Sequence, residues 1–288
     1  MHILLTGATG FLGRHIHAAL VHAGHTVRPV ARSLGHDFAR LQTPQDWLPL
    51  LHGMDAVVNA VGIIGQTRTQ RFDVLHTRAP QALFAACEVQ GVRRVLQISA
   101  QGADASAFSA YHLSKRAADD DLRSRRLQGW VLRPGLVFGP GGGSQALFMR
   151  LARLPRIPVL GDGQQAVQPV YVGDVAATVR TCLAQSDDSS SQTLDLVRPQ
   201  PIAFDDWLHT LRHLQGLPSA PLLHIPWALA HAGAAVLGPW WPLAHADNLA
   251  MLRRGHRADA SAWLRLWGQV PTAPTSAHLT AGSTLWTT

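Results

Sequence analysis

The chain has 288 residues, of which 47% are apolar and 15% charged, with a formal net charge of +7; this composition is typical of an ordered globular protein and excludes a disordered one. No apolar run reaches the ~18 residues of a membrane span, and the scattered basic residues lack interleaved aromatic residues, so no nucleic-acid partner is expected. With a strand expected from residue 2 onward and two distant cysteines expected to be reduced, we expect no signal peptide and a cytoplasmic protein.

The N-terminal residues have the order strand, glycine turn, helix. An apolar run at 3–5 is typical of a buried parallel strand, and three glycines at three-residue spacing precede a helical pattern from Phe11. This order is that of the first unit of a dinucleotide-binding fold. Gly7 would allow a sharp turn, Gly10 the close approach of a diphosphate, and Gly13 close packing of the helix, whose N-terminus attracts phosphates. The alternative is a purely structural turn.

The second expected strand, 25–31, is followed by Arg32. In this fold an acidic residue near that point holds the ribose 2′-hydroxyl of NAD, whereas an arginine suits a 2′-phosphate. We therefore expect NADP, with Arg14 as a second candidate contact, and keep NAD as the alternative, in which Arg32 is an ordinary surface residue. Asp37 and Phe38 are candidates for the wall around the adenine.

Strands and helices then alternate as far as about residue 180. Further strands are expected at 54–62, 94–99 and 130–133, and helices at 72–90 and 112–128. The strand at 54–62 ends in small residues, over which a cofactor would lie: Asn59, Ala60, Val61 and Gly62. The alternation predicts an α/β fold with a doubly wound parallel sheet of the Rossmann type.

The alternation is lost in the C-terminal third. We expect a Rossmann domain over 1–185, a polar linker over 185–192, a smaller, mainly helical substrate or lid lobe over 193–270, and a loose tail over 271–288. Helices are expected around 204–214, 227–237, 245–254 and 260–267. Seven of the nine tryptophans lie after residue 200; they either pack the lobe or form an apolar pocket, a partner contact or a membrane-surface contact. Before this region, Gly139–Gly143 is expected to be a mobile loop and Asp174 a helix N-cap.

Tyr111 and Lys115 carry the expected chemistry. They are four residues apart, so they lie on one face of a helix, and Lys115 is the only lysine among the 25 basic residues. An ammonium beside a phenol lowers the tyrosine pKa and lets the phenol exchange a proton. Lys115 could also donate to the ribose of the cofactor, and Ser99, at the end of a strand, could orient the substrate oxygen. The alternative is an incidental pair; no metal site is expected.

These motifs resemble the short-chain dehydrogenase/reductase superfamily: Thr6 to Gly13, then Ser99, Tyr111 and Lys115. The stretches 98–104, 132–141 and 168–176 look like its extended or atypical branch, which includes the NADPH-binding accessory subunit of respiratory complex I and free-standing bacterial relatives. The resemblance implies that Pro134 borders the nicotinamide. The complete expected cofactor set is Gly7, Thr9, Gly10, Phe11, Leu12, Gly13, Arg14, Arg32, Asp37, Phe38, Asn59, Ala60, Val61, Gly62, Tyr111, Lys115 and Pro134.

One departure from this superfamily affects the functional prediction. The catalytic asparagine, expected on the helix before the strand of Ser99, has no counterpart, because 72–90 contains no asparagine. Two hypotheses follow: an NADP-dependent oxidoreductase or epimerase-like enzyme acting on a carbonyl or secondary alcohol, with catalytic residues Tyr111, Lys115 and Ser99, or a non-catalytic NADPH-binding accessory or sensor protein. The tryptophan-rich lobe favours an apolar small-molecule substrate. Peripheral membrane or complex association stays open, as does the oligomeric state.

Overall fold

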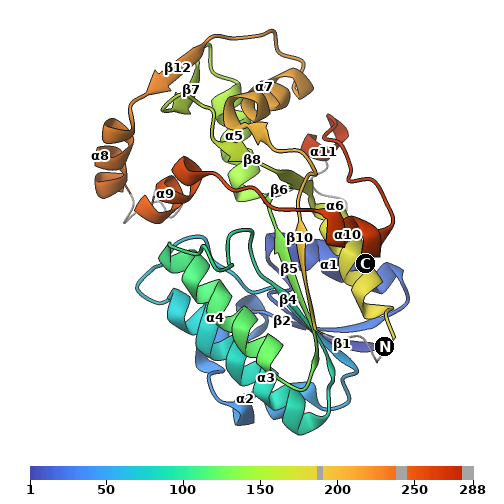
Figure 1. Cartoon of the computed structure of the whole chain (residues 1–288). Coiled ribbons are helices and arrows are strands. Elements are labelled where there is room, and N and C mark those ends of the chain that lie inside the picture. Colours follow the sequence, from blue (N-terminus) through green and yellow to red (C-terminus); the bar gives the residue numbers. More distant parts are fainter. Residues whose placement is uncertain (187–190, 238–244, 281–288) are drawn as a thin grey trace.

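The computed structural model describes residues 1–186, 191–237 and 245–280. Its lower part in Figure 1 is a parallel sheet with helices on both faces, and its upper part is a smaller group of helices and short strands. The sheet has six strands, in the spatial order β10 (Gln192–Leu196), β5 (Gln128–Pro134), β4 (Arg94–Ile98), β3 (Ala56–Asn59), β1 (His2–Thr6) and β2 (Thr26–Val30). All neighbouring pairs are parallel, which confirms the expected fold class.

The strand order locates the ligand-binding edge. From β1 the chain goes first to β2 on one side and then to β3 on the other, so the connections diverge between β1 and β3. Ligands of doubly wound sheets bind in the crevice at such a switch point, outside the carboxyl ends of the strands. In this chain that crevice is bordered by the turn after Thr6 and the segment after Asn59.

Burial on both faces follows the two-residue period of the strands. In β1, Ile3 and Leu5 belong to one apolar core and Leu4 to the other. The first core is covered by α1 (Phe11–His22), α6 (Val172–Leu183) and α10 (Ser261–Trp267), and the second by α2 (Pro44–Leu51), α3 (Ala79–Gln90) and α4 (Ala110–Ser124).

The upper part has its own apolar core around Phe138 and Trp207. Helices α5 (Gly143–Ala152) and α7 (Phe204–Leu214) pack against β7 (Ile157–Leu160), which pairs with β12 (Leu222–Ile225). The remaining elements are β6 (Leu136–Phe138), β8 (Ala166–Val167), β9 (Pro169–Tyr171), β11 (Ile202–Ala203), α8 (Trp227–Leu237), α9 (Ala246–Arg254), α11 (Ala277–Thr280), the 3-10 helices η1 (Arg32–Leu34) and η2 (Phe38–Arg40), and the π-helix η3 (Asp73–Arg78).

The two parts are interleaved along the chain more than the sequence indicated. Strand β10 completes the large sheet although it lies beyond residue 185, and α10 returns to it, with Trp263 and Trp267 in the first core. Helix α5, expected within the Rossmann domain, packs in the upper core instead. Trp240, Trp241 and Trp286 lie outside the described residues.

The expectation of a loose tail is wrong for residues 271–280. Asp174 accepts hydrogen bonds from the backbone N–H and the hydroxyl of Thr272 (2.7 and 2.6 Å), and the ring of His278 lies 4.2 Å from that of Tyr171. The expected N-cap role of Asp174 is also wrong: Tyr171 is the N-cap of α6, and the carboxylate holds the returning chain. Residues 281–288 lie outside the described range.

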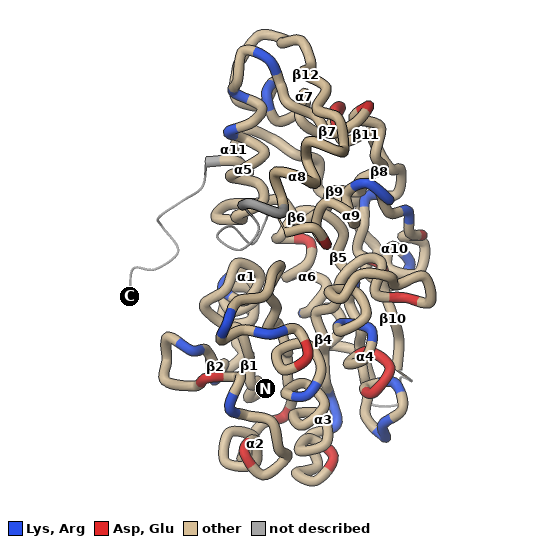
Figure 2. The backbone as a smooth tube through the Cα atoms, turned by 90° about the vertical axis from the view of Figure 1, so that its left-hand side faces the viewer, with Lys and Arg blue, Asp and Glu red and all other residues tan. Residues whose placement is uncertain are grey.

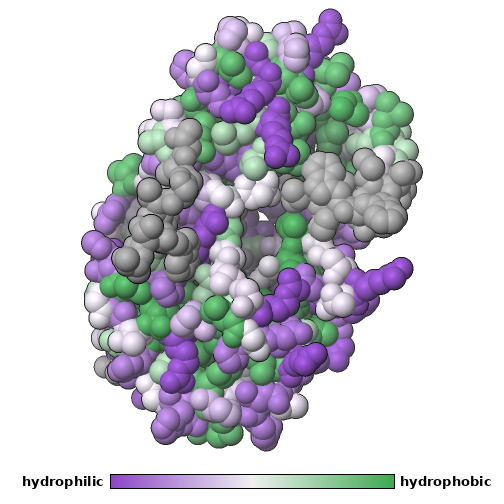
Figure 3. Space-filling model, turned by 180° about the vertical axis from the view of Figure 1, so that it is seen from behind, coloured by the Kyte–Doolittle hydropathy of each residue, from purple (hydrophilic) through white to green (hydrophobic). Residues whose placement is uncertain are grey.

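Charged residues are not gathered on one part of the described chain. Basic and acidic residues are spread over both parts of the tube in Figure 2, and apolar and polar residues are mixed on the face shown in Figure 3, which is hollowed between the two parts. None of the helices in the described ranges combines the length and the hydropathy that a bilayer crossing requires.

Candidate active site

The glycine turn after β1 is tightly packed against the end of β3. Gly7 has φ +66°, and a Cβ at this position would lie 2.7 Å from the carbonyl oxygen of Ala60. A Cβ at Gly13 would lie only 2.0 Å from the carbonyl oxygen of Gly7, so α1 can approach the turn only with a glycine at that position. The sequence predicted both roles, and this packing places the N-terminus of α1 at the switch point.

The N-terminus of α1 has the properties of an anion site. Its N-cap is Gly10, no side chain caps the free N–H groups, and the first turn contains no acidic residue. In contrast, Ser109 caps α4 and Thr43 forms a capping box with Asp46 in α2. Uncapped N–H groups and the positive end of the helix dipole suit a diphosphate. The residues present therefore fit a dinucleotide.

The expected adenosine end lies beside this turn. Arg32 is exposed at the start of η1, and the hydroxyl of Ser33 donates to that of Thr9 (3.2 Å). Asp37 caps η2 by accepting from the N–H of Ala39 (3.1 Å). Phe38 is only 6% exposed, and its ring centroid lies 5.2 Å from that of Trp47. Most of its ring therefore packs in the apolar core.

Arg14 contacts a loop of the protein. Its guanidinium donates to the carbonyl of Pro140 (2.7 Å), and His15 Nε2 lies 3.1 Å from the same oxygen. A Cβ on Gly142 would lie 3.1 Å from the ring of Phe11. The loop 139–143, expected to be mobile, is therefore docked on the first turn of α1.

Asn59, at the end of β3, connects three strands. Fully buried, it accepts a hydrogen bond from Thr6 Oγ1 (2.5 Å) and donates one to Gln97 Oε1 (2.6 Å). Thr6, Asn59 and Gln97 end or nearly end β1, β3 and β4. These hydrogen bonds fix the end of β3, after which the chain continues through Ala60, Val61 and Gly62.

Lys115 lies at the same edge, 3% exposed. Its ammonium donates to the carbonyl oxygens of Val61 (3.1 Å) and Ile98 (3.0 Å), and a Cβ on Gly62 would come within 3.2 Å of Nζ. Burial lowers the pKa of Lys115 to about 8, although Asp119 raises it. Two of the three ammonium donors are thus used by the protein, which leaves one donor.

Tyr111 keeps its proton more firmly than the sequence suggested. Burial, followed by the negative charge of Asp119, raises the pKa of Tyr111 to about 12, the opposite direction from the one expected. Lys115 directs its ammonium to two carbonyl oxygens instead. At neutral pH the side chain is a phenol, which is the form that donates a proton to a substrate oxygen.

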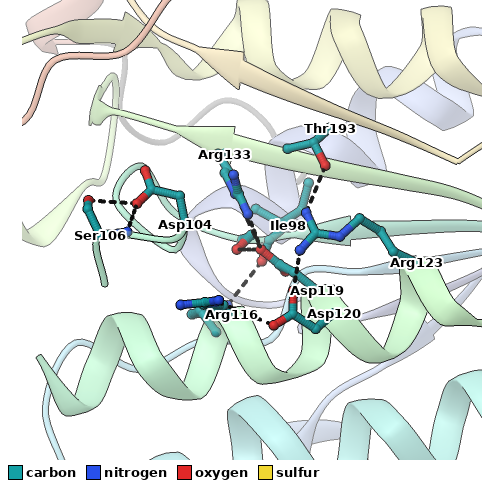
Figure 4. Close-up of polar contacts among 11 residues, drawn as sticks. Ile98, Asp104, Ser106, Arg116, Asp119, Asp120, Arg123, Arg133 and Thr193 are labelled. Carbon is teal, nitrogen blue, oxygen red and sulfur yellow. Dashed lines mark hydrogen bonds and ion pairs between the residues drawn. The ribbon is translucent and has the colours of Figure 1, made fainter. Parts of the chain in front are cut away.

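Ser99 has a partner that the sequence analysis missed. Its hydroxyl donates to Asp119 Oδ2 (2.6 Å), and the same oxygen lies 3.4 Å from Arg133 Nε. Figure 4 shows Arg133 reaching from β5 toward Asp119 on α4. The spacing could have revealed this residue, because Tyr111, Lys115 and Asp119 follow at i, i+4 and i+8 on one helix face. The Ser99 oxygen can still accept a hydrogen bond.

His76 is a second missed residue, in the helix where the family asparagine was sought. It lies in the π-helix η3, fully buried. Its Nε2 accepts from the N–H of Ile63 (3.0 Å), and its Nδ1 lies 3.0 Å from Ser114 Oγ. Burial, with Lys115 nearby, lowers the pKa of His76 well below its usual value. This neutral imidazole links the segment after β3 to α4, with its ring against that of Tyr111.

One pocket brings two of the three catalytic candidates together, Tyr111 and Ser99, whereas Lys115 is not among its lining residues. It has a volume of about 290 Å³ and includes four expected site residues: Leu12, Ser99, Tyr111 and Pro134. Its other walls come from β6 and β8 and from the end of α9, with residues the sequence did not indicate: Gln101, His112, Gln168, Met251, Leu252, Gly255 and His256. The pocket thus lies between the carboxyl edge of the sheet and the C-terminal elements.

Gln168 fixes the relation between these walls. It is 1% exposed and accepts from Gln101 Nε2 (2.7 Å) and from the N–H of Ala258 (2.8 Å). Its own amide donates to the carbonyls of Arg198 (2.8 Å) and Ala258 (3.0 Å). All these hydrogen bonds are partly buried. The Gln168 side chain therefore fixes the position of the returning C-terminal segment relative to the edge of the sheet.

A buried imidazole in this pocket makes stability depend on pH. Burial, with His256 nearby, lowers the pKa of His112 to about 4, below the unfolded value near 6.5. The contribution of His112 is complete above pH 6.5 and is lost as the pH falls toward 4, because the unfolded state then binds more protons. Between pH 6.5 and 5 the wild type should lose roughly 2 kcal/mol more unfolding free energy than His112→Gln. Urea unfolding at both pH values tests this, with exposed His52→Gln as the control that should follow the wild type; equal losses in His112→Gln and wild type would contradict the assignment.

Comparison with known proteins adds three findings. Residues 3–195 match the model of the NAD dependent epimerase/dehydratase family. The chain is 32% identical over 187 residues to a ceramide reductase of Caulobacter vibrioides (61% of this chain, 58% of the relative). It is 28% identical over 213 residues to the mitochondrial NADH dehydrogenase (ubiquinone) 1 alpha subcomplex subunit 9 of Arabidopsis thaliana (67% of this chain, 52% of the relative). The matched region therefore spans little more than half of each relative.

A solved structure shares the fold over nearly the whole chain. The UDP-glucuronic acid 4-epimerase of Bacillus cereus, solved in complex with UDP-glucuronic acid and NAD, has a TM-score of 0.70 and 17% sequence identity, with 96% of each chain covered. At this identity the likeness concerns the fold, including the upper part of the molecule.

Proposed function

The chain belongs to the NAD dependent epimerase/dehydratase family, and from this membership we propose that it is an NADP-dependent oxidoreductase acting on a carbonyl or secondary alcohol of a small molecule. The observation that carries the proposal is the joint position of Tyr111 and Lys115 at the carboxyl edge of the sheet, with Tyr111 in the wall of the pocket. The family is NAD(P)-dependent; NADP in particular is the proposal.

Each site residue has a role in this proposal. The uncapped N–H groups after Gly10 would hold the diphosphate, and Lys115 would donate its remaining N–H to a ribose hydroxyl. In the reducing direction Tyr111 donates its phenolic proton to the carbonyl oxygen and regains one from solvent, and the Ser99 oxygen accepts from a polar group of the substrate. A nicotinamide nucleotide, when bound, would supply the hydride that the carbonyl carbon receives. We also propose that the upper part serves as the substrate lobe.

Native mass spectrometry of the purified protein tests the cofactor proposal. We expect NADP or NADPH to be retained, or to bind on addition, and to give a complex of the corresponding mass. A protein that binds neither NADP(H) nor NAD(H) at millimolar concentration would overturn it.

The preference for NADP rests on Arg32, exposed beside the glycine turn. Arg32→Ala should weaken NADPH binding about 10- to 100-fold and leave NADH binding unchanged, because charge-assisted hydrogen bonds contribute about 1.5–3 kcal/mol. Dissociation constants for both nucleotides provide the measurement. Arg40→Ala is the matched control, since this arginine is also exposed but pairs with Asp37 (3.7 Å). An unchanged ratio of the two constants in Arg32→Ala would remove the phosphate role.

A non-catalytic NADPH-binding accessory protein is the second candidate. Two observations favour it: the Ser99 hydroxyl is engaged by Asp119, and His76 lies in the helix where the family asparagine was expected. The similarity to the NADH dehydrogenase subunit is compatible with association with a larger complex. This candidate predicts tight NADPH binding with no turnover of any carbonyl compound.

We propose a cytoplasmic location on the basis of the cysteines. Cys87 and Cys182 are both free and buried, and burial raises the pKa of each thiol. Free thiols persist in reducing compartments. Their burial also protects them from oxidation, so fractionation of cells is the direct test.

A further inference from the structure

We propose that this pocket takes an uncharged carbonyl compound with an apolar chain and rejects nucleotide-diphosphate sugars. The inference rests on the proposed function, because it assigns the substrate of the same pocket. It concerns a property that the fold does not determine, since the solved neighbour of the same fold was captured with a UDP-sugar.

The wall of the pocket carries no formal charge in the described part of the chain. Among the described residues that line it, none is lysine, arginine, aspartate or glutamate. Six of the lining residues carry large aliphatic or thioether side chains: Leu12, Leu136, Val137, Val167, Met251 and Leu252. Such a surface gains free energy by covering an apolar chain, whereas a desolvated phosphate group needs a cation or several donors.

Four arginines are close to the pocket in sequence; Arg257 is exposed, and the other three are engaged elsewhere. Arg133, next to Pro134, faces the buried carboxylate of Asp119. The guanidinium of Arg254 lies 4.7 Å from the ring centroid of Phe108 and donates to the carbonyl of Ser106 (2.9 Å). Arg253 lies 5.5 Å from the ring centroid of Trp227. These three guanidinium groups, which could have bound a diphosphate bidentately, thus contact other groups of the protein.

The two histidines of the wall are neutral at pH 7. Their ring centroids are 4.9 Å apart, and Gly102 (φ +85°) lets them meet, because a Cβ there would lie 2.6 Å from His256 Cε1. Burial lowers the pKa of His112 to about 4 and lowers that of His256. In the described structure His112 Nδ1 and His256 Nε2 are buried without a hydrogen-bond partner. Neutral imidazoles suit an uncharged polar group of a substrate, such as a hydroxyl or an amide.

Matched probes separate the substrate classes. Undecan-2-one and 10-oxoundecanoate share a methyl ketone and an apolar chain, and they differ in one distant carboxylate; UDP-glucose represents the nucleotide-diphosphate sugars. Binding of each is measured calorimetrically to the full chain saturated with NADP⁺, a state in which a ketone cannot be reduced. We expect undecan-2-one to bind at least tenfold more tightly than the oxo acid, and UDP-glucose not to bind. Equal or tighter binding of either anion, or no binding of the ketone, overturns the inference.

A charge placed in the wall should invert this preference. Met251→Lys is expected to lower the affinity for undecan-2-one at least tenfold and to raise that for 10-oxoundecanoate, whereas Met251→Leu should keep the wild-type order of affinities. If the lysine variant binds all three probes as the wild type does, the ketones do not occupy this pocket and the inference fails.

Turnover is measured separately, so that this inference and the proposed function can fail independently. Oxidation of NADPH with undecan-2-one supports both. A ketone that binds the NADP⁺ complex but is never reduced by the NADPH complex leaves the substrate class in place and removes the oxidoreductase. Reduction of the oxo acid in preference to the ketone would support the oxidoreductase and remove the proposed substrate class.

Discussion

Tyr111→Phe should lower kcat/KM for carbonyl reduction by about 10²- to 10⁴-fold, the contribution of a positioned general acid. The only group lost is the hydroxyl of the phenol, whose pKa is raised to about 12 by burial and Asp119. The ring contacts with Phe72 and His76 remain, so the fold and the NADPH dissociation constant should be unchanged. Steady-state kinetics and nucleotide titration of the two proteins provide the measurements.

The chain offers a matched control, because it has only two tyrosines. Tyr171 packs against Phe138 and His278 in the upper part, and Tyr171→Phe should keep wild-type kcat/KM. If Tyr111→Phe retained full activity, the assignment of the proton donor would be wrong. If the wild type bound NADPH tightly and reduced no carbonyl compound, the accessory-protein hypothesis would take the place of the enzyme.

Gly13→Ala is expected to lower the free energy of unfolding by about 3 kcal/mol or more, at the upper end of the overpacking range. The added methyl group would lie 2.0 Å from the carbonyl oxygen of Gly7 and 2.9 Å from the Cα of Ala8. Both are backbone atoms, so no side chain can rotate away. Helix α1 must move from the turn, and NADPH affinity should fall with stability. Urea unfolding with and without NADPH measures both effects.

Gly143→Ala is the control for this substitution. Gly143 is the first residue of α5, and a Cβ there would meet nothing within 4 Å. Alanine should therefore leave the stability unchanged or raise it by up to ~1 kcal/mol, because it restricts the unfolded chain. Equal unfolding free energies for Gly13→Ala and the wild type would show that α1 does not need the close approach.

Local patterns predicted the elements of this fold well. The helix expected at 227–237 is α8 with the same bounds, and the turn before Phe11 lies at the switch point. Errors arose where distant segments decide the structure. Nothing near Gln192 indicates that it begins a strand beside β5, and nothing near Thr272 indicates that Asp174 would hold it.

The site shows the same division between local and long-range information. The spacing of Tyr111 and Lys115 put both on one helix face, and both lie at the sheet edge. The predicted direction of the tyrosine pKa shift was wrong, because the sequence analysis recognised neither the burial of the Tyr111 phenol nor the nearby negative charge of Asp119. His256 could not be found from the sequence, since its contact with His112 depends on how the C-terminal segment returns.

The hydrogen bonds of Gln168 mark the two ends of one chain segment. Its amide donates to the carbonyls of both Arg198 and Ala258. The segment between these two residues therefore begins and ends at the same side chain, next to the sheet. That intervening stretch contains Met251 and His256 but none of the glycines that adjoin the diphosphate site. Because β12 of this stretch pairs with β7 and α7 packs on α5, a change in the recognised compound requires both chain segments to change together, while the nucleotide cradle stays intact.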